Sequence, residues 1–427
     1  MKNKQKALLM YAIGYLGIAV LTQTTVKWYQ YYYAPPELNE HGLQLLVPLG
    51  FIGLAMVIAR IVDGIADPVV AYFSDKSKHP KGRRIPYIAY GVVPLVVTFI
   101  LLWFPPVSKQ STINLIYLTV ILALFFIFFT IVVTPYLALI GEVTDTKEER
   151  IKLTTMQGIS QVIGVIIAEA GSGILISSYG FKVMGVTLGI ISLISISLTP
   201  LFIKEEKKVE VHSFSMGESI LLTLKNKNFL RYLFFYITIW FGINTLTISM
   251  PYMTDILLGK SAEMSGLLIG SAFIFALIFS LFIPKLTNKF SKKLIMMFTA
   301  LLFSILLFAT SLFGILISFP IAFILILFAG IPLSVIFIIP NAMVADIAER
   351  DGIEHNEQRE GMFFGAQGLI IKIVIGLSSF VTPFIFATFG YSAEQSLGLQ
   401  LVGPISGVFI LLGMWVLSFY DLPDEHL

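Results

Sequence analysis

Three ionisable residues interrupt a long apolar stretch near the N-terminus. Arg60, Asp63 and Asp67 fall within residues 45–73, which are otherwise apolar and long enough to cross a bilayer. On an α-helix the three side chains share one face, within about 60° of one another. A charge at membrane depth costs about 2.5 kcal/mol or more, so three together predict mutual pairing, contact with water or a bound ion. An internal salt bridge that only joins helices is the alternative interpretation.

The acidic pair has the chemistry of a cation site. Asp63 and Asp67 are spaced i, i+4, and Thr130 or Thr134 on a later predicted helix adds a hydroxyl. Hard cations such as sodium and lithium prefer oxygen ligands. A proton on one carboxylate also suits the pair, because two close acids repel when both are ionised. The residues therefore predict a coupling ion, sodium or a proton with lithium as a variant, and no organic cofactor.

Two basic residues are the candidate counter-charges of this pair. Arg60 lies on the same helix face, and Lys372 lies about 18 Å from the cytoplasmic end of its predicted helix, the same depth as Asp63. A lysine that competes with a cation for one carboxylate pair links cation binding to release of the lysine.

The composition indicates the kind of scaffold that positions these residues. Of the 427 residues, 56% are hydrophobic and only 13% are charged, which is typical of a polytopic membrane protein. The chain has no cysteine, which excludes disulfides and thiolate metal sites. Apolar runs predict twelve spans, at residues 8–33, 45–74, 85–105, 112–141, 153–178, 182–203, 229–254, 262–284, 293–314, 316–345, 361–389 and 397–420.

The distribution of basic residues predicts the orientation. The N-terminus and the loops after even-numbered spans hold 23 of the 29 lysines and arginines, so both termini are predicted to be cytoplasmic. This pattern also explains the net charge of +3 without a nucleic-acid partner. The sequence thus predicts an all-α membrane protein of two six-helix bundles, residues 1–203 and 229–427, joined by a cytoplasmic linker, 204–228. A monomer in a cell membrane, most simply the prokaryotic cytoplasmic membrane, is the expected state.

The two halves of the chain contain similar sequence segments. The segment from Thr134 resembles the segment from Ile339, with Pro135 matching Pro340 and Gln157-Gly158 matching Gln367-Gly368. Parallel six-helix repeats are typical of one large transporter fold, which places the solute site between the halves near the midplane. A repeat of loop sequence alone is the alternative.

Other polar residues within spans are candidate contacts of the solute. Lys27 lies beside a run of aromatic residues, so an ammonium that snorkels to the outer interface is the alternative for it. Glu169, flanked by glycines, suits a solute or proton role or a polar helix contact. The candidate cavity residues are Gln23, Lys27, Gln157, Glu169, Asn244 and Thr247.

Charged residues at the cytoplasmic helix ends predict a gate. Arginines after the second span can bridge to acids after the fourth span and hold one face shut; retention of topology is the alternative. The candidate gate residues are Asp75, Arg83, Arg84, Glu142, Asp145, Asp346 and Arg359.

No nucleotide-binding loop, metalloprotease motif or nucleophile triad occurs in the sequence. The chain is therefore predicted to be a secondary transporter and not an enzyme. The leading hypothesis is a cation-coupled symporter that imports a sugar-like or other small organic solute. A proton-coupled exporter, a transporter of lysolipids or other amphipathic solutes and a membrane sensor that moves nothing are the alternatives.

The motif of the second span resembles that of a known family. Asp-x-x-x-Asp-Pro from Asp63, followed by Gly-Arg-Arg-x-Pro from Gly82, is similar to the glycoside-pentoside-hexuronide:cation symporter family of the major facilitator superfamily, whose best-known member is melibiose permease. The resemblance covers nearly the whole chain. It implies twelve helices that alternate access, cation-site roles for Asp63, Asp67 and Thr130, and a lysine at Lys372 close to both sites.

The resemblance weakens at the positions that hold sugar in melibiose permease. Residues 15–19 contain no acid, and the positions of other sugar contacts are occupied by Val133, Leu137 and Gln157 or Gly158. The cation machinery matches and the sugar contacts do not, so another glycoside, a uronide or a more apolar solute is left open.

Overall fold

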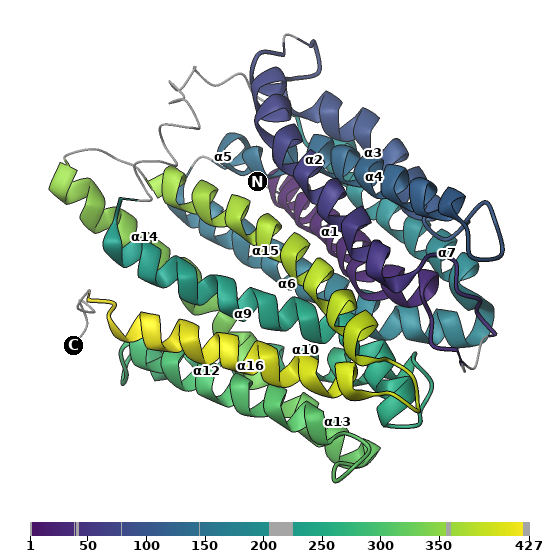
Figure 1. Ribbon diagram of the computed structural model, residues 1–427. Coiled ribbons are helices and arrows are strands. Elements are labelled where there is room, and N and C mark those ends of the chain that lie inside the picture. The colour runs from purple at the N-terminus through teal and green to yellow at the C-terminus, as the bar shows by residue number, and fades with distance from the viewer. Residues whose placement is uncertain are drawn as a thin grey trace. The chain divides into compact units, whose positions relative to one another are not determined.

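The protein is built of helices (Figure 1). The computed structural model describes residues 2–37, 39, 42–77, 79–144, 146–204, 225–355 and 360–421. These form two compact units, residues 1–211 with 263–270, and residues 212–262 with 271–427. The predicted boundaries at residues 203 and 229 stay a prediction, because most of the predicted linker lies outside the described residues.

The first unit is a bundle in which α1 packs against α6 and α7, while α4 packs against α2 and α3. Aromatic side chains close the bundle at one end, where the rings of Tyr32, Trp103 and Phe181 lie with centroids 4.8–6.1 Å apart. The elements are α1 (Lys2–Tyr33), α2 (Leu49–Asp75), α3 (Ile85–Leu101), α4 (Thr112–Ala138), α5 (Ile140–Val143), α6 (Lys147–Ile166), the π-helical turn η1 (Ile167–Gly171) and α7 (Ser172–Phe202).

The second unit has α9 at its centre, packed against α15 and α16, and α12 packed against α14 and α16. Its core is rich in buried aromatic residues, among them Phe229, Tyr232, Phe235 and Phe363. The elements are α9 (Lys227–Tyr252), η2 (Met253–Leu257), α10 (Met264–Ser280), α11 (Ile283–Thr287), α12 (Lys292–Ala309), η3 (Thr310–Leu312), α13 (Phe319–Phe328), α14 (Gly330–His355), α15 (Glu360–Phe389) and α16 (Leu397–Ser418); residues 263–270, which include the start of α10, group with the first unit.

Within the described part of the chain, nine helical stretches are long and apolar enough to cross a membrane, and α3 and α10 are shorter apolar helices. The longest stretch, Lys152–Phe202, is divided at Gly180, whose φ of 79° lies in the left-handed region that glycine tolerates. This break falls between the fifth and sixth predicted spans. The count of twelve spans and the cytoplasmic location of the termini stay predictions.

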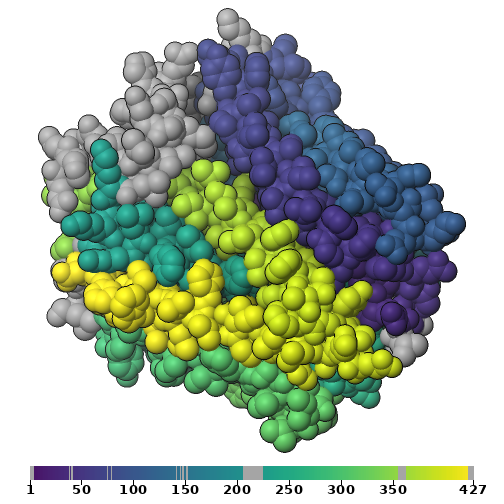
Figure 2. All heavy atoms as spheres, viewed as in Figure 1, coloured from purple at the N-terminus to yellow at the C-terminus, as the bar shows by residue number. Residues whose placement is uncertain are grey.

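The outer faces of the helices in the first unit are apolar. Ile61 and Ile65 on α2, Ile116 on α4 and Ile174 on α7 are 58–67% exposed. In the space-filling view α2, in purple-blue, and α4, in blue, lie next to each other on the visible face (Figure 2). Large exposed apolar faces are expected where hydrocarbon rather than water surrounds the helices.

Candidate functional site

The carboxylates of α2 meet two threonine hydroxyls of α4. Asp63 is fully buried, and Asp67, one turn further along, is partly buried. Thr130 Oγ1 donates to Asp63 Oδ1 at 2.6 Å and lies 3.3 Å from Asp67 Oδ1; Thr134 Oγ1 lies 3.3 Å from the same oxygen. The i, i+4 spacing on each helix brings about this match, because two turns of α2 face two turns of α4. Four oxygen atoms from four side chains therefore gather at one place in the first unit.

Arg60 completes this group of charges. Its Nη1 lies 3.3 Å from Asp63 Oδ2, and its guanidinium stacks over the ring of Phe126 with Cζ 3.9 Å from the centroid. Phe126 precedes Thr130 by one turn of α4, so one helix face supplies both the ring and the hydroxyl. The stacking on Phe126 was not predicted from the sequence, where Phe126 is one of many aromatic residues in an apolar run.

The group has the donor set of a monovalent cation site. With both carboxylates ionised and Arg60 protonated, the net charge is one negative. Carboxylate and hydroxyl oxygens are ligands that hard cations prefer. The site residues Asp63, Asp67, Thr130 and Thr134 therefore fit sodium or lithium chemically, with Asp63 shared between the cation and Arg60.

The candidate residues of the second unit are placed on α9, α14 and α15. Asn244 on α9 donates to Ser378 Oγ of α15 at 2.6 Å, a polar contact between helices, while the Thr247 hydroxyl donates to the Ile243 carbonyl of its own helix. Asp346 forms an ion pair with Lys292. Lys372 is half-buried on α15. Its pairing with Asp63 stays a prediction.

Lys27 does not snorkel to an interface, and that interpretation is wrong. Its side chain is fully buried, and Nζ lies 2.9 Å from Glu169 Oε2, with Glu169 only 1% exposed. A buried carboxylate 142 residues further along the chain holds the ammonium inside the bundle, which no local pattern in the sequence could reveal. Of the other cavity candidates in this unit, Gln23 is partly exposed and Gln157 is buried.

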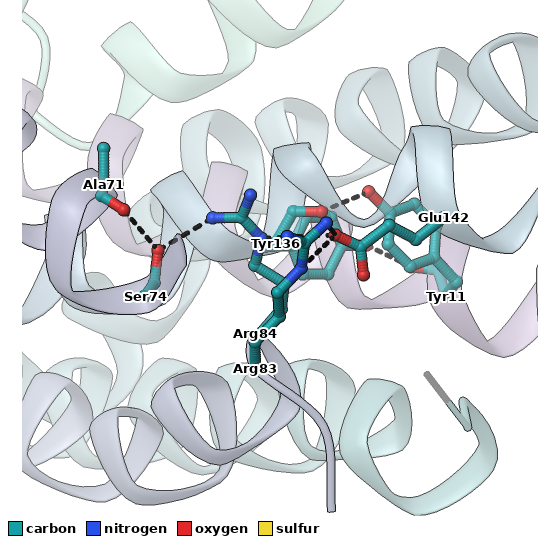
Figure 3. Close-up of polar contacts among 7 residues, drawn as sticks. All are labelled: Tyr11, Ala71, Ser74, Arg83, Arg84, Tyr136 and Glu142. Carbon is teal, nitrogen blue, oxygen red and sulfur yellow. Dashed lines mark hydrogen bonds and ion pairs between the residues drawn. The ribbon is translucent and has the colours of Figure 1, made fainter. Parts of the chain in front are cut away.

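The predicted gate arginines converge on one acid. Arg83 donates to Glu142 Oε1 of α5 from Nε at 3.1 Å and from Nη2 at 2.8 Å, and Arg84 Nε reaches the same oxygen at 3.4 Å (Figure 3). Arg84 Nη1 also donates to Ser74 Oγ at the end of α2 at 2.8 Å, a contact not predicted from the sequence. The cluster ties the α2–α3 loop to α5 within the first unit. The predicted gate residues Asp145 and Arg359, and the side chain of Asp75, lie outside the described residues.

A tyrosine pair joins α1 to α4 beside this cluster. The rings of Tyr11 and Tyr136 stack with centroids 4.4 Å apart, and each hydroxyl donates to the backbone carbonyl of the other residue (Figure 3). Both side chains are fully buried. The two reciprocal bonds fix α1 against the end of α4 just before the chain reaches Glu142. Sequence reasoning did not find this pair.

The chain is similar to known membrane transporters in sequence and in fold. Residues 10–424 match the family described as MFS/sugar transport protein. YnaJ of Bacillus subtilis, named an uncharacterized symporter, is 26% identical over 404 residues, which cover 87% of this chain and 84% of the relative. The sodium-dependent lysophosphatidylcholine symporter 1 of Xenopus tropicalis is 28% identical over 128 residues, 30% of this chain and 24% of the relative. The crystal structure of the nucleoside transporter NupG has the same fold, with a TM-score of 0.70 at 14% identity over 98% of both chains.

Proposed function

We propose that this chain, which belongs to the family of MFS/sugar transport proteins, is a cation-coupled symporter that binds its coupling ion at Asp63 and Asp67. The chain is a multi-pass membrane protein of the major facilitator fold, a secondary transporter and not an enzyme.

The observation that carries the proposal is the convergence of four side-chain oxygens from α2 and α4. Thr130 Oγ1 contacts both carboxylates, and Thr134 adds a second hydroxyl next to Asp67. A site for a proton alone needs one carboxylate and no further ligands. The second carboxylate and the two hydroxyls therefore support sodium, with lithium as a smaller substitute. The relative from Xenopus tropicalis, which is named sodium-dependent, supports the same ion.

Coupling follows from competition for Asp63. Arg60 holds Asp63 Oδ2 at 3.3 Å, and a cation at Asp63 Oδ1 withdraws part of that carboxylate's charge from Arg60. Cation binding and the strength of the Arg60 contact are then linked equilibria. Lys372 on α15 is proposed as a second competitor for the same carboxylate. When the cation is bound, the charge of the site at Asp63 and Asp67 is neutralised, and this favours the change between outward and inward access. The empty site is charged and opposes that change.

The proposed solute is a glycoside or another small polar organic compound. The family description, sugar transport, supports this class. The relative named for lysophosphatidylcholine supports an amphipathic solute as the second candidate. The proposed acting unit is a monomer in the bilayer.

Uptake into proteoliposomes tests the proposal. Sodium, lithium and proton gradients are imposed separately, and accumulation of glycosides, uronides and lysophosphatidylcholine is measured for each gradient. A sodium gradient is expected to drive accumulation of a glycoside, and a proton gradient alone is not. Accumulation that follows only the proton gradient would contradict the sodium site, and solute expulsion would indicate an exporter.

A further inference from the structure

The first unit contains a second intramembrane charge pair, remote in sequence from the α2 carboxylates. Lys27 on α1 and Glu169 in η1 are 0% and 1% exposed, with Nζ 2.9 Å from Oε2. Lys27 Nζ also donates to the backbone carbonyl of Glu169 at 3.1 Å and lies 4.9 Å from the ring centroid of Trp28. Ionisable residues at membrane depth are rare and costly, so a pair of them is a candidate functional site.

Stability does not account for the pair. Removing two charges from water costs about as much as their attraction returns, so apolar residues of similar volume in the same positions are often equally or more stabilising. The helices around the pair are held together without it, since α1 and α7 are joined by the Trp28 Nε1 to Ser172 Oγ hydrogen bond at 2.7 Å.

The backbone is specially shaped where the pair lies. Glu169 is at the centre of the π-helical turn Ile167–Gly171, and single π turns within α-helices frequently occur at functional sites. The chain at 263–270, which belongs to the same unit, lies directly on this turn: a Cβ added to Gly266 would be 2.0 Å from the Glu169 carbonyl oxygen and 3.2 Å from Lys27 Nζ. Only glycine permits this approach.

Further buried polar groups lie on the segments that carry Lys27 and Gly266. The carboxylate of Glu263, 6% exposed, acts electrostatically on Lys27. The hydroxyls of Thr24, one turn before Lys27, and of Ser265, next to Gly266, are fully buried and have no hydrogen-bond partner within the described part of the chain. Buried hydroxyls are nearly always hydrogen-bonded in proteins, so these two hydroxyls are candidate contacts for groups that come from outside the chain.

We propose that Lys27 and Glu169 recognise the solute, and that the solute carries neighbouring hydroxyl groups, as a glycoside does. The inference rests on the proposed symport function and adds the residues that select its solute. An ammonium donates only and a carboxylate accepts only. Neighbouring hydroxyls satisfy both, because one accepts from Lys27 while the other donates to Glu169. In the absence of solute the two charges neutralise each other, and solute hydroxyls replace that contact.

The test replaces the pair in two ways and compares it with a matched control. Lys27→Met with Glu169→Met removes both charges but keeps side-chain length, and Lys27→Glu with Glu169→Lys reverses them. The control is Lys4→Met with Glu149→Met, which removes the exposed 2.7 Å ion pair between α1 and α6. Binding of methyl glycosides of glucose, galactose and xylose is measured by thermal stabilisation, uptake by proteoliposome assay, and sodium binding by sodium-dependent stabilisation.

The apolar pair is expected to fold, to keep sodium-dependent stabilisation, and to lose glycoside affinity at least tenfold, while the control binds and transports like wild type. Wild-type glycoside affinity in the folded apolar variant overturns the proposal, as does a wild-type protein that binds none of the three glycosides. If the variant with two methionines does not fold, the variant with reversed charges provides the test. Wild-type transport by the reversed variant would show that the pair is structural. A reversed variant that folds but does not bind glycosides would support a role in recognition. If sodium does not stabilise the wild-type protein, the proposed cation site is refuted instead.

Discussion

Replacing Thr130 by valine is expected to weaken sodium binding about 10- to 150-fold. Thr130 Oγ1 is the atom that contacts both carboxylates, at 2.6 Å from Asp63 Oδ1 and 3.3 Å from Asp67 Oδ1. Valine keeps the shape of the buried side chain and removes only the hydroxyl. A hydrogen bond to a charged group contributes about 1.5–3 kcal/mol, and we take the contact between the hydroxyl oxygen and the ion to be of the same order. At 1.4 kcal/mol for each factor of ten, that loss gives the expected range.

The measurement is the rise in unfolding temperature of the purified transporter as sodium is added, since a ligand that binds only the folded state stabilises it. Thr130→Ser keeps the hydroxyl and is expected to bind sodium within a few-fold of wild type. Thr119→Val is the matched control, because the Thr119 hydroxyl on the same helix donates to the Leu115 carbonyl. Wild-type sodium affinity in Thr130→Val would refute the assignment of this hydroxyl as a ligand.

Three further predictions concern the surroundings of the site. Arg60→Gln changes the net charge of the site from one negative to two, so half-maximal stabilisation is expected at a lower sodium concentration. Glu142→Gln removes the charge of a side chain that is only 7% exposed and pairs with two arginines, so stability should fall by more than the value of about 1 kcal/mol for a surface pair, while hydrogen exchange over residues 140–143 should become faster. Gly185→Ala places a methyl 2.1 Å from the ring of Trp103, and such overpacking costs about 1–3 kcal/mol, measured as a lower unfolding temperature.

Each of these has an outcome that contradicts it. Unchanged sodium affinity in Arg60→Gln would mean that the guanidinium does not compete for Asp63. Unchanged exchange in Glu142→Gln would leave the cluster without a role in holding α5. Gly158→Ala is the control for Gly185, because its added methyl meets nothing within 4 Å. Equal unfolding temperatures for the two alanine variants would refute the close approach at Trp103.

The spacing of residues near one another in the sequence predicted the helices and the side chains that share a helix face. Apolar runs gave the helices, with the break at Gly180 in place, and i, i+4 spacing placed Asp63 and Asp67 on one face of α2 with a threonine of α4 in reach. The predicted boundary between the ninth span, 293–314, and the tenth span, 316–345, falls where the chain leaves α12 and η3 and begins α13, with a further break at Ala329 inside the predicted tenth span.

Partners remote in sequence could not be predicted in the same way. Lys27 was compatible with an interface because a run of aromatic residues follows it, whereas the bundle buries it against Glu169 on η1. The contact depends on the packing of α1 against the π turn, which apolar periodicity does not encode. The reciprocal Tyr11–Tyr136 hydrogen bonds were not predicted for the same reason, because nothing in the sequence distinguishes these two tyrosines from the other aromatic residues of the spans.

Solute accumulation by Asp63→Asn tests cation coupling most directly. Wild type, Asp63→Asn and Asp421→Asn, a control at an exposed position outside the spans, are reconstituted in proteoliposomes, and uptake of the transported solute is followed with an inward sodium gradient. Wild type and the control are expected to concentrate the solute above its external level. Asp63→Asn is expected only to equilibrate it, because the coupling ion has lost its buried carboxylate. Full sodium-driven accumulation by Asp63→Asn would contradict the account.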